Sequence, residues 1–288
     1  MIVTHLKGGL GNQMFQYACG FALAKEFNTT HKLDLSYYSS IPSNHTKREF
    51  ELSQFQISSS IANSSDILKT KGEDSSLTNF SEDINAKFYS IFTSIYPIKK
   101  YFGVKNLYLD GYFQSEKFFR NYRKEILKEF TLKQELETNE FSKIAKEIKD
   151  NNNSVSMHIR RGDYVSDEKT AKHHGVLDMN YYQEALNLLN IQNPHIFIFS
   201  DDINWVKNNF SFLPKNSCFV PDSSLNSAQS ITLMSLCKHN IIANSSFSWW
   251  GAWLNRNNQK VVIAPKKWVK SILFVNPDII PHGWHRIQ

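Results

Sequence analysis

The sequence lacks the cysteine and histidine patterns that hold disulfide-rich proteins and metal sites together. It contains 3 cysteines, an odd number, and none of them forms a CxxC pair. A disulfide framework and a cysteine-rich zinc site are therefore not expected, and a reducing compartment is the simplest interpretation. The 10 histidines show no metal-ligand spacing, and the HExxH pattern is absent. We therefore expect no bound metal.

Long apolar runs and basic blocks are missing as well. No uninterrupted apolar stretch approaches the roughly 20 residues of a membrane span, and the first residues reach glycine too early for the apolar core of a signal peptide. The predicted location is the cytoplasm, with peripheral contact at the inner membrane left open. The formal net charge of +6 favours an anionic partner. Because lysine and arginine are scattered rather than clustered, a nucleic-acid-binding protein is not expected.

The chain does have enough length and apolar material for two lobes. Its 288 residues are 41% hydrophobic and 14% aromatic, which suffices for real cores and for ligand clefts lined by rings. Domains usually span about 100–200 residues. The most polar internal cluster, Asp-Asn-Asn-Asn at 150–153, is the predicted boundary. It separates a lobe over 1–150 from a lobe over 151–288.

The first lobe is predicted to begin as strand, glycine turn and helix. The turn is Gly8-Gly9-Leu10-Gly11, and residues 56–90, which are rich in serine and asparagine, are expected to be irregular. The other predicted elements of this lobe are strands at 2–6, 32–35 and 106–113, a helix at 12–27, and two charged amphipathic helices within 115–150.

The second lobe is predicted to alternate strands with helices. This order implies a parallel sheet covered by helices on both faces, so the fold class is α/β. The predicted strands are 154–159, 195–199, 217–220, 240–243 and 260–264, and the predicted helices are 180–189, a segment around Trp205, 228–238 and 249–255.

Polar clusters follow three of these strands directly. They are Arg160–Asp163, Ser200–Asp202 and Asn244–Ser248. In open parallel sheets, ligands bind outside the carboxyl ends of the strands. The three clusters therefore point to one site at one edge of the sheet.

Two adjacent arginines make the first cluster the most informative. A guanidinium group donates two parallel charged hydrogen bonds, which suits a phosphate. Alternation at the strand end puts His158 and Arg160 on one face and Arg161 on the other. An internal salt bridge to an aspartate is the alternative for a single arginine, and a half-buried structural histidine is the alternative for His158.

The other clusters have structural alternatives too. Ser200 and Asp201 either contact a ligand or form a helix N-cap. The small residues of Asn244–Ser248 open a helix and offer donors to an anion, with Phe247 expected in the loop. The turn at Gly8–Asn12 lacks the GxGxxG spacing, so it is a weak nucleotide signature and equally a tight strand-to-helix turn.

Taken together, five segments resemble the α-1,2-fucosyltransferases of glycosyltransferase family 11. They are GGLGNQMFQYA at 8–18, GYFQSEKFF at 111–119, HIRRGDY at 158–164, FSDD at 199–202 and NSSFSWWGAWLN at 244–255. The resemblance runs in order from residue 8 to roughly residue 268. It implies a GT-B-like fold of two Rossmann-like lobes with the donor site in the cleft. It also implies an inverting, metal-independent transfer of L-fucose from GDP-β-L-fucose to the 2-hydroxyl of a galactoside, forming an α-1,2 linkage.

The resemblance assigns roles to the lobes and to their residues. The lobe over 1–150 is the acceptor side, and the lobe over 151–288 binds GDP-fucose. Arg160, His158 and Asp163 are the expected catalytic residues, with Arg160 on the diphosphate. The expected donor-binding residues are Arg160, Arg161, Ser200, Asp201, Asn244, Ser245, Ser246, Phe247 and Ser248. The expected acceptor or sugar side is Gly9, Gly11, Asn12 and Gln13.

The resemblance also names partners and leaves three points open. The acceptor is a galactose-terminated oligosaccharide or a lipid-linked glycan, and no cofactor is needed beyond the donor substrate. Candidates for the general base are Asp163, Glu168 and His158. Many family members carry an acidic residue that reads guanine where this chain has Ser230, so Asp222 or a backbone carbonyl is the expected substitute. A transferase for another sugar nucleotide is the alternative function.

Overall fold

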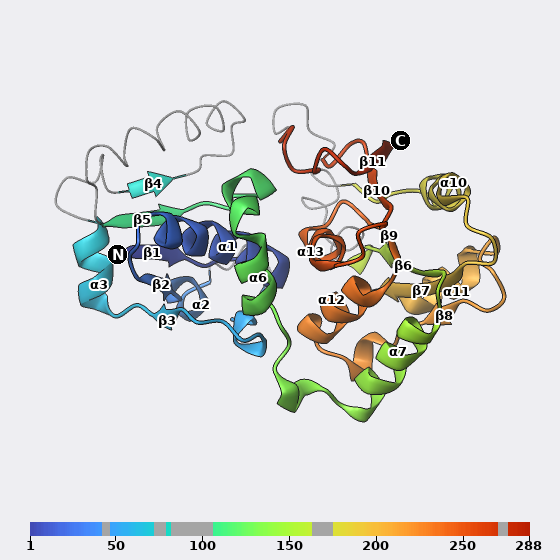
Figure 1. Cartoon of the computed structure of the whole chain (residues 1–288), viewed down its shortest axis with the longest axis horizontal. Coiled ribbons are helices and arrows are strands. Elements are labelled where there is room, and N and C mark those ends of the chain that lie inside the picture. Colours follow the sequence, from blue (N-terminus) through green and yellow to red (C-terminus); the bar gives the residue numbers. More distant parts are fainter. Residues whose placement is uncertain (42–46, 72–78, 82–105, 163–174, 270–275) are drawn as a thin grey trace. The chain divides into compact units, whose positions relative to one another are not determined.

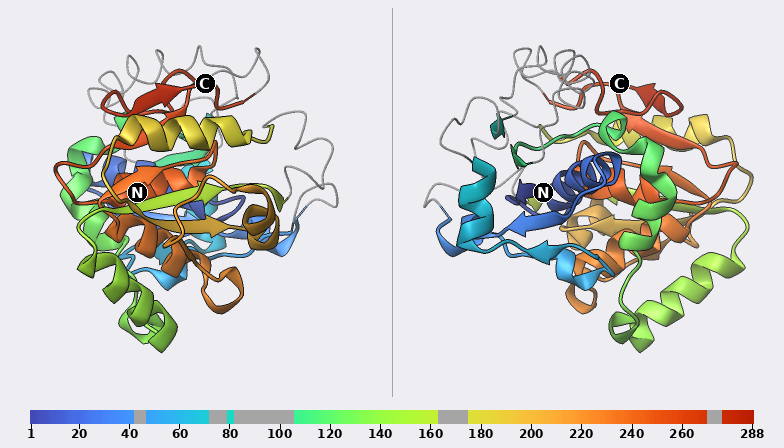
Figure 2. Two further views of the ribbon diagram at one scale, coloured as in Figure 1. Left: turned by 90° about the vertical axis from the view of Figure 1, so that its right-hand side faces the viewer. Right: turned by 60° about the vertical axis from the view of Figure 1, so that its left-hand side comes forward.

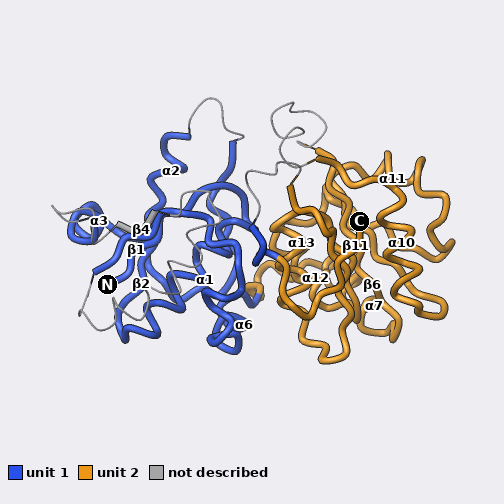
Figure 3. The backbone as a smooth tube through the Cα atoms, turned by 90° about the horizontal axis from the view of Figure 1, so that it is seen from above, with its two compact units in different colours: residues 1–131, 276–279 blue, residues 132–275, 280–288 orange. Residues whose placement is uncertain are grey.

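The computed structural model describes residues 1–41, 47–71, 79–81, 106–162, 175–269 and 276–288 and divides into two compact units (Figures 1 and 3). Unit 1 comprises Met1–Thr131 with Asn276–Ile279, and unit 2 comprises Leu132–Val275 with Ile280–Gln288. The division follows Thr131 rather than residue 150. The polar segment at 150–153 is only the turn between a helix and a strand of unit 2.

Helix α7 (Asn139–Asp150) explains why the boundary lies earlier. Its apolar side is buried in unit 2, and Gln229 of helix α12 (Ser227–Leu236) fixes the segment that leads into it. Gln229 Nε2 donates to the Leu136 carbonyl at 2.6 Å and contacts Thr138 Oγ1, the N-cap of α7, at 3.3 Å. These buried contacts tie α7 to the second sheet.

Unit 1 is built on a five-stranded parallel sheet of order β3-β2-β1-β5-β4. Its strands are β1 (Ile2–His5), β2 (His31–Asp34), β3 (Ser60–Ile61), β4 (Asn79–Ser81) and β5 (Leu107–Asp110). Its helices include α1 (Leu10–Glu26), α2 (Ser36–Ser39), α3 (Ser64–Lys71) and α6 (Arg123–Glu129).

The glycine turn after β1 is shorter than predicted. Gly8 has a φ of +79°, which favours glycine, and Gly9 is the N-cap of α1. Gly11 therefore lies inside the helix. α1 is buried along most of its length, which is why it begins as soon as the chain has turned.

The segment at 56–90, predicted to be irregular, contains β3, α3 and β4 within its described residues. The serines and asparagines of this segment lie at the starts and ends of these elements, so they do not make the whole segment irregular. Asn63 Oδ1 accepts from Asp66 N at 2.9 Å, and Asp66 Oδ2 accepts from Asn63 N at 3.0 Å. This reciprocal pair starts α3 in the manner of a capping box.

Alternation along β1 separates two environments. Thr4 lies against Gly20 of α1, where an added Cβ would come within 2.1 Å of the Thr4 hydroxyl. Ile2 packs on the same face with Leu23 of α1. His5 is on the opposite face from Thr4, and its ring stacks on Tyr108 of β5.

Unit 2 confirms the predicted parallel sheet. Its order is β11-β10-β9-β6-β7-β8, and every pair is parallel. The strands are β6 (Ser154–Ile159), β7 (His195–Ser200), β8 (Cys218–Phe219), β9 (His239–Ile241), β10 (Val262–Pro265) and β11 (His285–Ile287).

Helices cover both faces of this sheet, as expected. Helices α10 (Met179–Leu189) and α11 (Ile203–Asn209) lie on one face, and α7, α12 and α13 (Ser246–Leu254) lie on the other (Figures 1 and 2). The β6 residues Val155, Met157 and Ile159 share a core with α10 and α11. The alternate residues of β6, including His158, therefore face α12 and α13. Of the helices in the described part of the chain, none combines the length and apolar character needed to cross a bilayer.

Candidate functional site

Three polar segments meet at the carboxyl edge of the sheet in unit 2. β6 lies between β9 and β7, and all three strands are parallel. The segments that follow them therefore emerge side by side, as the sequence predicts. Asp163 and Glu168 lie outside the described residues.

Asp201 organises the loop that carries Arg160. Its Oδ2 lies 2.9 Å from Arg160 Nη1, and its Oδ1 accepts a hydrogen bond from the Arg161 backbone N–H at 2.8 Å. Gly162 permits this approach, since a Cβ there would lie 2.5 Å from Asp201 Oδ2. The Arg160 side chain remains 23% exposed. Asp201 therefore fixes an arginine that still reaches the surface at the strand edge.

Arg161 is held differently and points to helix α11. Its Nε lies 3.2 Å from Asp202 Oδ2, and its guanidinium lies 3.5 Å from the centre of the Trp205 ring. Asp202 also caps α11 by accepting from Trp205 N. The two arginines diverge to different carboxylates, as strand alternation predicts. Cation–π stacking on tryptophan makes Arg161 a packing residue of this unit.

Ser200 and Asp202 provide the turn between β7 and α11. Ser200 Oγ accepts from the Asp202 backbone N–H at 3.0 Å, and Asp202 is the N-cap. The N-cap role that the sequence offered for this cluster therefore belongs to Asp202. Asp201 instead bonds the loop that carries Arg160 and Arg161.

His158 is buried close to the charges of Arg160 and Asp201. Its side chain lies beside Phe247, with ring centres 5.5 Å apart, and within the described residues its Nδ1 has no hydrogen-bond partner. Burial lowers the pKa of His158 to about 4; Asp201 opposes this shift and Arg160 adds to it. The imidazole is therefore neutral at pH 7 and a weak base. Its pKa argues against His158 as the general base.

Helix α13 begins three residues before the predicted start at 249. Phe247 therefore lies in the first turn of the helix rather than in a loop. The sequence-based prediction was wrong because Ser245 caps the helix, accepting from Phe247 N. Trp249, Trp250 and Trp253 are buried, in agreement with a packing role. The rings of Trp249 and Trp253 stack, and both meet Trp250 edge-on.

Two members of the Asn244–Ser248 segment are committed to the fold. Asn244 Nδ2 donates to the carbonyls of Gly175 and Trp268, both at 3.2 Å. Ser248 Oγ is buried and contacts backbone carbonyls of Ala243 and Ser245. Ser246, the first residue of α13, lies at this helix start, where the helix dipole favours an anion.

Of the predicted acceptor residues of unit 1, some are likewise bonded within the fold, whereas others lie at the start of α1. Gln13 is fully buried: its Nε2 donates to the carbonyls of Gly8 and Glu49, and its Oε1 accepts from the backbone of Glu51 and Leu52. No hydrogen-bonding capacity is left for a ligand. Asn12 Oδ1 accepts from Gln114 Nε2 at 2.9 Å. Gly11 lies within α1, whereas Gly9 caps it beside the Arg48 side chain.

Asp222 lies within electrostatic reach of the arginine loop. It begins a short 3₁₀ turn, Asp222–Ser224, and its side chain is exposed. Burial and Asp201 raise the pKa of Asp222, and Arg160 lowers it. Ser230, in contrast, is buried in the first turns of α12, and its N–H donates to the Asn226 carbonyl.

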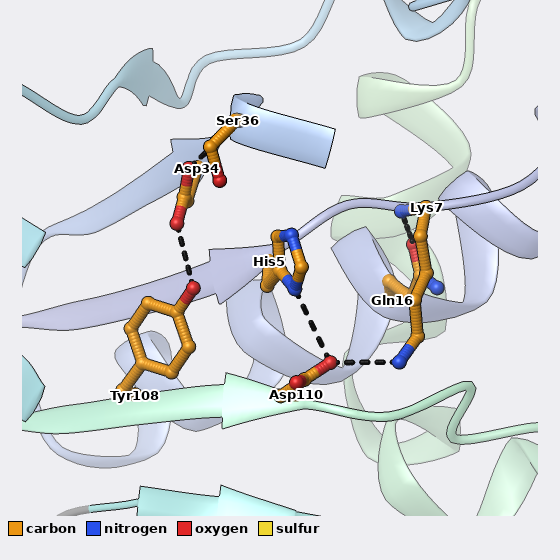
Figure 4. A network of polar contacts seen from close by, with 7 residues as sticks. All are labelled: His5, Lys7, Gln16, Asp34, Ser36, Tyr108 and Asp110. Atoms are coloured by element: carbon orange, nitrogen blue, oxygen red, sulfur yellow. Dashed lines mark hydrogen bonds and ion pairs between the residues drawn. The ribbon is translucent and has the colours of Figure 1, made fainter. Parts of the chain in front are cut away.

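Sequence reasoning missed a second polar cluster, in unit 1 (Figure 4). His5, Asp34 and Asp110 are the last residues of three neighbouring parallel strands, β1, β2 and β5. Asp110 Oδ1 lies 2.8 Å from Lys7 Nζ and 3.3 Å from His5 Nδ1. The hydrogen bond from His5, together with Lys7, holds the pKa of Asp110 well below its usual range against the opposing effect of burial. The strand-end rule used for the second lobe would have found this cluster.

Comparison with known proteins places this geometry in a family. A model described as glycosyl transferase family 11 matches residues 1–288. The chain belongs to glycosyltransferase family 11. The O-antigen biosynthesis glycosyltransferase WbnK of Escherichia coli is 38% identical, over 91% of this chain and 93% of its own length. An α-1,2-colitosyltransferase of Escherichia coli is 35% identical, over 100% and 99%. The galactoside 2-α-L-fucosyltransferase Sec1 of Mus musculus is 26% identical, over 88% and 64%.

Solved structures of fucosyltransferases share the fold of this glycosyltransferase. NodZ from Bradyrhizobium superposes with a TM-score of 0.53 at 17% identity, covering 87% of this chain and 91% of NodZ. A variant of Arabidopsis thaliana FUT1 in complex with GDP gives a TM-score of 0.51 at 11% identity, over 91% and 70%. At these identities the likeness concerns the fold alone. With two parallel α/β units, the architecture is GT-B-like, as the sequence implies.

Proposed function

We propose that this family 11 glycosyltransferase transfers L-fucose from GDP-β-L-fucose to the 2-hydroxyl of a terminal galactoside with inversion, forming an α-1,2 linkage. The observation that carries the proposal is Arg160, which directly follows β6, is held at 2.9 Å by Asp201, and stays partly exposed at the strand edge. A fixed guanidinium fork at that position suits a diphosphate. The family membership and the similarity to α-1,2-transferases support the same reaction.

The chemistry follows from where charge develops. As the fucose–oxygen bond breaks, negative charge builds on the β-phosphate of the leaving GDP. Arg160 and the positive end of α13 at Ser246 stabilise that charge without reorganising. Arg161 supports the loop from Trp205 rather than contacting the donor.

Positive charge from Arg160 replaces a metal in this proposal. We expect activity to survive EDTA. A loss of more than about tenfold that Mg²⁺ or Mn²⁺ restores would contradict the metal-independent mechanism, because it would correspond to about 1.4 kcal/mol of transition-state stabilisation.

A second donor has support of its own. The colitosyltransferase is 35% identical over the full chain, against 26% for the mouse fucosyltransferase. The second candidate is therefore the same inverting transfer from GDP-colitose.

A direct donor competition separates the two candidates. Purified protein is incubated with GDP-fucose, GDP-colitose or GDP-mannose and a panel of β- and α-galactosides, and the linkage is determined by NMR. We expect kcat/KM to be highest with GDP-fucose and the product to be α-1,2-linked. Arg160→Ala should lower kcat by about 10²–10³, whereas Arg256→Ala, which removes an exposed arginine of the same unit, should not. A higher kcat/KM with GDP-colitose would replace the fucosyl assignment.

A further inference from the structure

The polar cluster of unit 1 has the features of a ligand site that the donor chemistry does not use. His5, Lys7 and Asp110 gather where β1 and β5 end (Figure 4). Ligands of parallel α/β sheets bind outside the carboxyl ends of the strands. The His5 side chain is 18% exposed, that of Lys7 25%, and that of Asp110 40%. The cluster is therefore built into the fold and still open to solvent.

Asp110 determines which ring nitrogen of His5 donates a hydrogen bond and which one can accept. An ionised carboxylate only accepts hydrogen bonds, so His5 Nδ1 and Lys7 Nζ must both donate to Asp110 Oδ1. With its proton on Nδ1, a neutral His5 carries its lone pair on Nε2. Within the described residues, Nε2 has no hydrogen-bond partner. The imidazole therefore presents a fixed acceptor, and Asp110 presents a second carboxylate oxygen beside it.

The groups around His5 complete a surface suited to a polyhydroxylated molecule. The groups that face or contact its ring are Asp110, Lys7, Tyr37, Tyr108 and Asp34. Tyr108 OH donates to the buried Asp34 at 2.6 Å, so that pair is internally satisfied. Tyr37 meets His5 edge-on, and Lys7 lies over the Tyr112 ring. Partly exposed rings beside a few fixed polar groups are typical of small-molecule sites.

We propose that His5, with its orientation fixed by Asp110 and Lys7, is a binding residue for the acceptor glycan, accepting a hydrogen bond from a sugar hydroxyl through Nε2. This inference rests on the proposed function for the identity of the acceptor as a galactoside. Asp110 and Lys7 are positioning residues, since they set the tautomer and orientation of the ring. His5, Lys7 and Asp110 all belong to unit 1, whereas the proposed donor residues belong to unit 2.

Substitutions at His5 separate binding from structural support. His5→Ala removes the acceptor atom and should raise the acceptor KM about tenfold, the effect of about 1.4 kcal/mol from one lost hydrogen bond. His5→Gln keeps an amide that can donate to Asp110 and accept from a hydroxyl, so it should restore most of the affinity. Neither variant should change the KM for GDP-fucose.

A matched ion pair in the same unit provides the control. Asp66 pairs with Lys32 at 2.8 Å, the same length as the Lys7–Asp110 pair, but not at the strand edge. Asp110→Asn should raise the acceptor KM, because it weakens the bonds from Asp110 to His5 and to Lys7 that orient the His5 ring. Asp66→Asn should leave that KM within twofold of wild type. Thermal melts check that each variant is folded.

The split between the acceptor KM and kcat gives a readout that separates a binding residue from a general base. His5→Gln should leave kcat close to the wild-type value, because it keeps a hydrogen-bonding group and removes no group that moves a proton, while the GDP affinity is measured in parallel as reference. If His5→Gln instead lowers kcat by a hundredfold or more at unchanged acceptor KM, His5 is a general base rather than a binding residue, and the proposal is wrong.

Binding without turnover distinguishes this inference from the proposed function. Saturation-transfer NMR with lactose and GDP measures acceptor binding by the wild type and by His5→Ala. If lactose binds through His5 but no fucose is transferred, the proposed function fails and the acceptor site stands. If fucose is transferred and His5→Ala binds lactose as tightly as wild type, the acceptor site is refuted. A rise in the KM for GDP-fucose alone would also refute it, by placing His5 on the donor.

Discussion

Asp201 shows how one carboxylate can prepare an arginine for a ligand. It bonds the side chain of Arg160 and the backbone of Arg161, and Gly162 gives it room. The sequence allowed either a salt bridge or a phosphate contact for Arg160. The structure pairs Nη1 with Asp201 while leaving the side chain partly exposed, so the salt bridge is compatible with the ligand role. A pre-positioned guanidinium loses less conformational entropy when it binds.

Substitution of Arg160 should affect turnover more than ground-state binding. The leaving diphosphate gains charge in the transition state, so Arg160→Ala should lower kcat by about 10²–10³. Arg160→Lys keeps the charge but loses the planar fork, and it should not restore activity. Steady-state kinetics and GDP titration measure the two effects, and GDP affinity should fall less than kcat.

Arg161 is the matched comparison for Arg160. Because it stacks on Trp205 and pairs with Asp202, Arg161→Ala should lower the melting temperature but reduce kcat much less. Near-normal turnover by Arg160→Lys together with inactivity of folded Arg161→Ala would reverse the roles of the two arginines.

Asp222 is the stronger candidate for the guanine contact. It lies near Asp201 and Arg160, whereas Ser230 is buried in α12. Asp222→Asn keeps the size but loses the charge, so it should weaken GDP binding by about 10- to 100-fold, as loss of a charged hydrogen bond of about 1.5–3 kcal/mol does. Ser230→Ala should change the dissociation constant less than twofold. Isothermal titration with GDP tests both, and two negligible effects would show that neither side chain reads the base.

Helices and strands differ in how well the sequence predicts their limits. Strands β6 and β7 were predicted within one residue because they are apolar runs buried on both faces. Helix starts were less accurate where serine, asparagine or glycine could be either loop or cap. The early start of α13 at Ser246 and the unpredicted α3 both depend on cap hydrogen bonds that no periodicity encodes.

The link between α7 and α12 is a helix-level contact whose strength can be measured. Gln229 closes a capping box with Asn226 and also donates to Leu136 O at 2.6 Å. Asn226→Ala should lower the free energy of unfolding by about 1 kcal/mol through loss of the cap. Gln229→Ala should cost about 1–3 kcal/mol, since it also leaves the partly buried Leu136 carbonyl without this hydrogen bond. Urea unfolding compares them with exposed Gln259→Ala, and a smaller effect at Gln229 than at Asn226 would contradict the link.

At the scale of the whole molecule, the order of elements was easier to predict than the division into units. Alternating strands and helices identified the sheet of unit 2 and its ligand edge. The boundary was misplaced because α7, though next to a polar turn, is held by side chains nearly a hundred positions away in the chain, such as Gln229. The His5–Asp110 pair, which joins the ends of β1 and β5, is a contact of the same long-range kind. Such contacts depend on strand order, which local patterns do not contain.

The stability of unit 2 should fall in mild acid, because its fold holds histidine side chains in their neutral form. Tryptophan fluorescence can measure this change. All 6 tryptophans lie in this unit, so their fluorescence follows its unfolding. The pKa of His158 is lowered by burial to about 4, whereas an unfolded histidine titrates near 6.5. Between these values the unfolded chain binds the extra proton, so the free energy of unfolding falls as pH decreases. Burial also lowers the pKa of His239, which adds in the same direction, and the raised pKa of Asp222 opposes them.

Between pH 7 and pH 5, His158 should lower the free energy of unfolding by about 2 kcal/mol. This follows from a change of about 1.4 kcal/mol for each pH unit below 6.5. Urea unfolding followed by tryptophan fluorescence at both pH values measures it. His158→Gln cannot titrate and should reduce the difference by that amount, while His282→Gln, at an exposed position of the same unit, should not. Carboxylates with lowered pKa values, such as Asp110, lose their contribution only below their ordinary value near 3.8, and Asp110 belongs to unit 1. An unchanged pH dependence in folded His158→Gln would mean that this histidine is not held neutral in the native state.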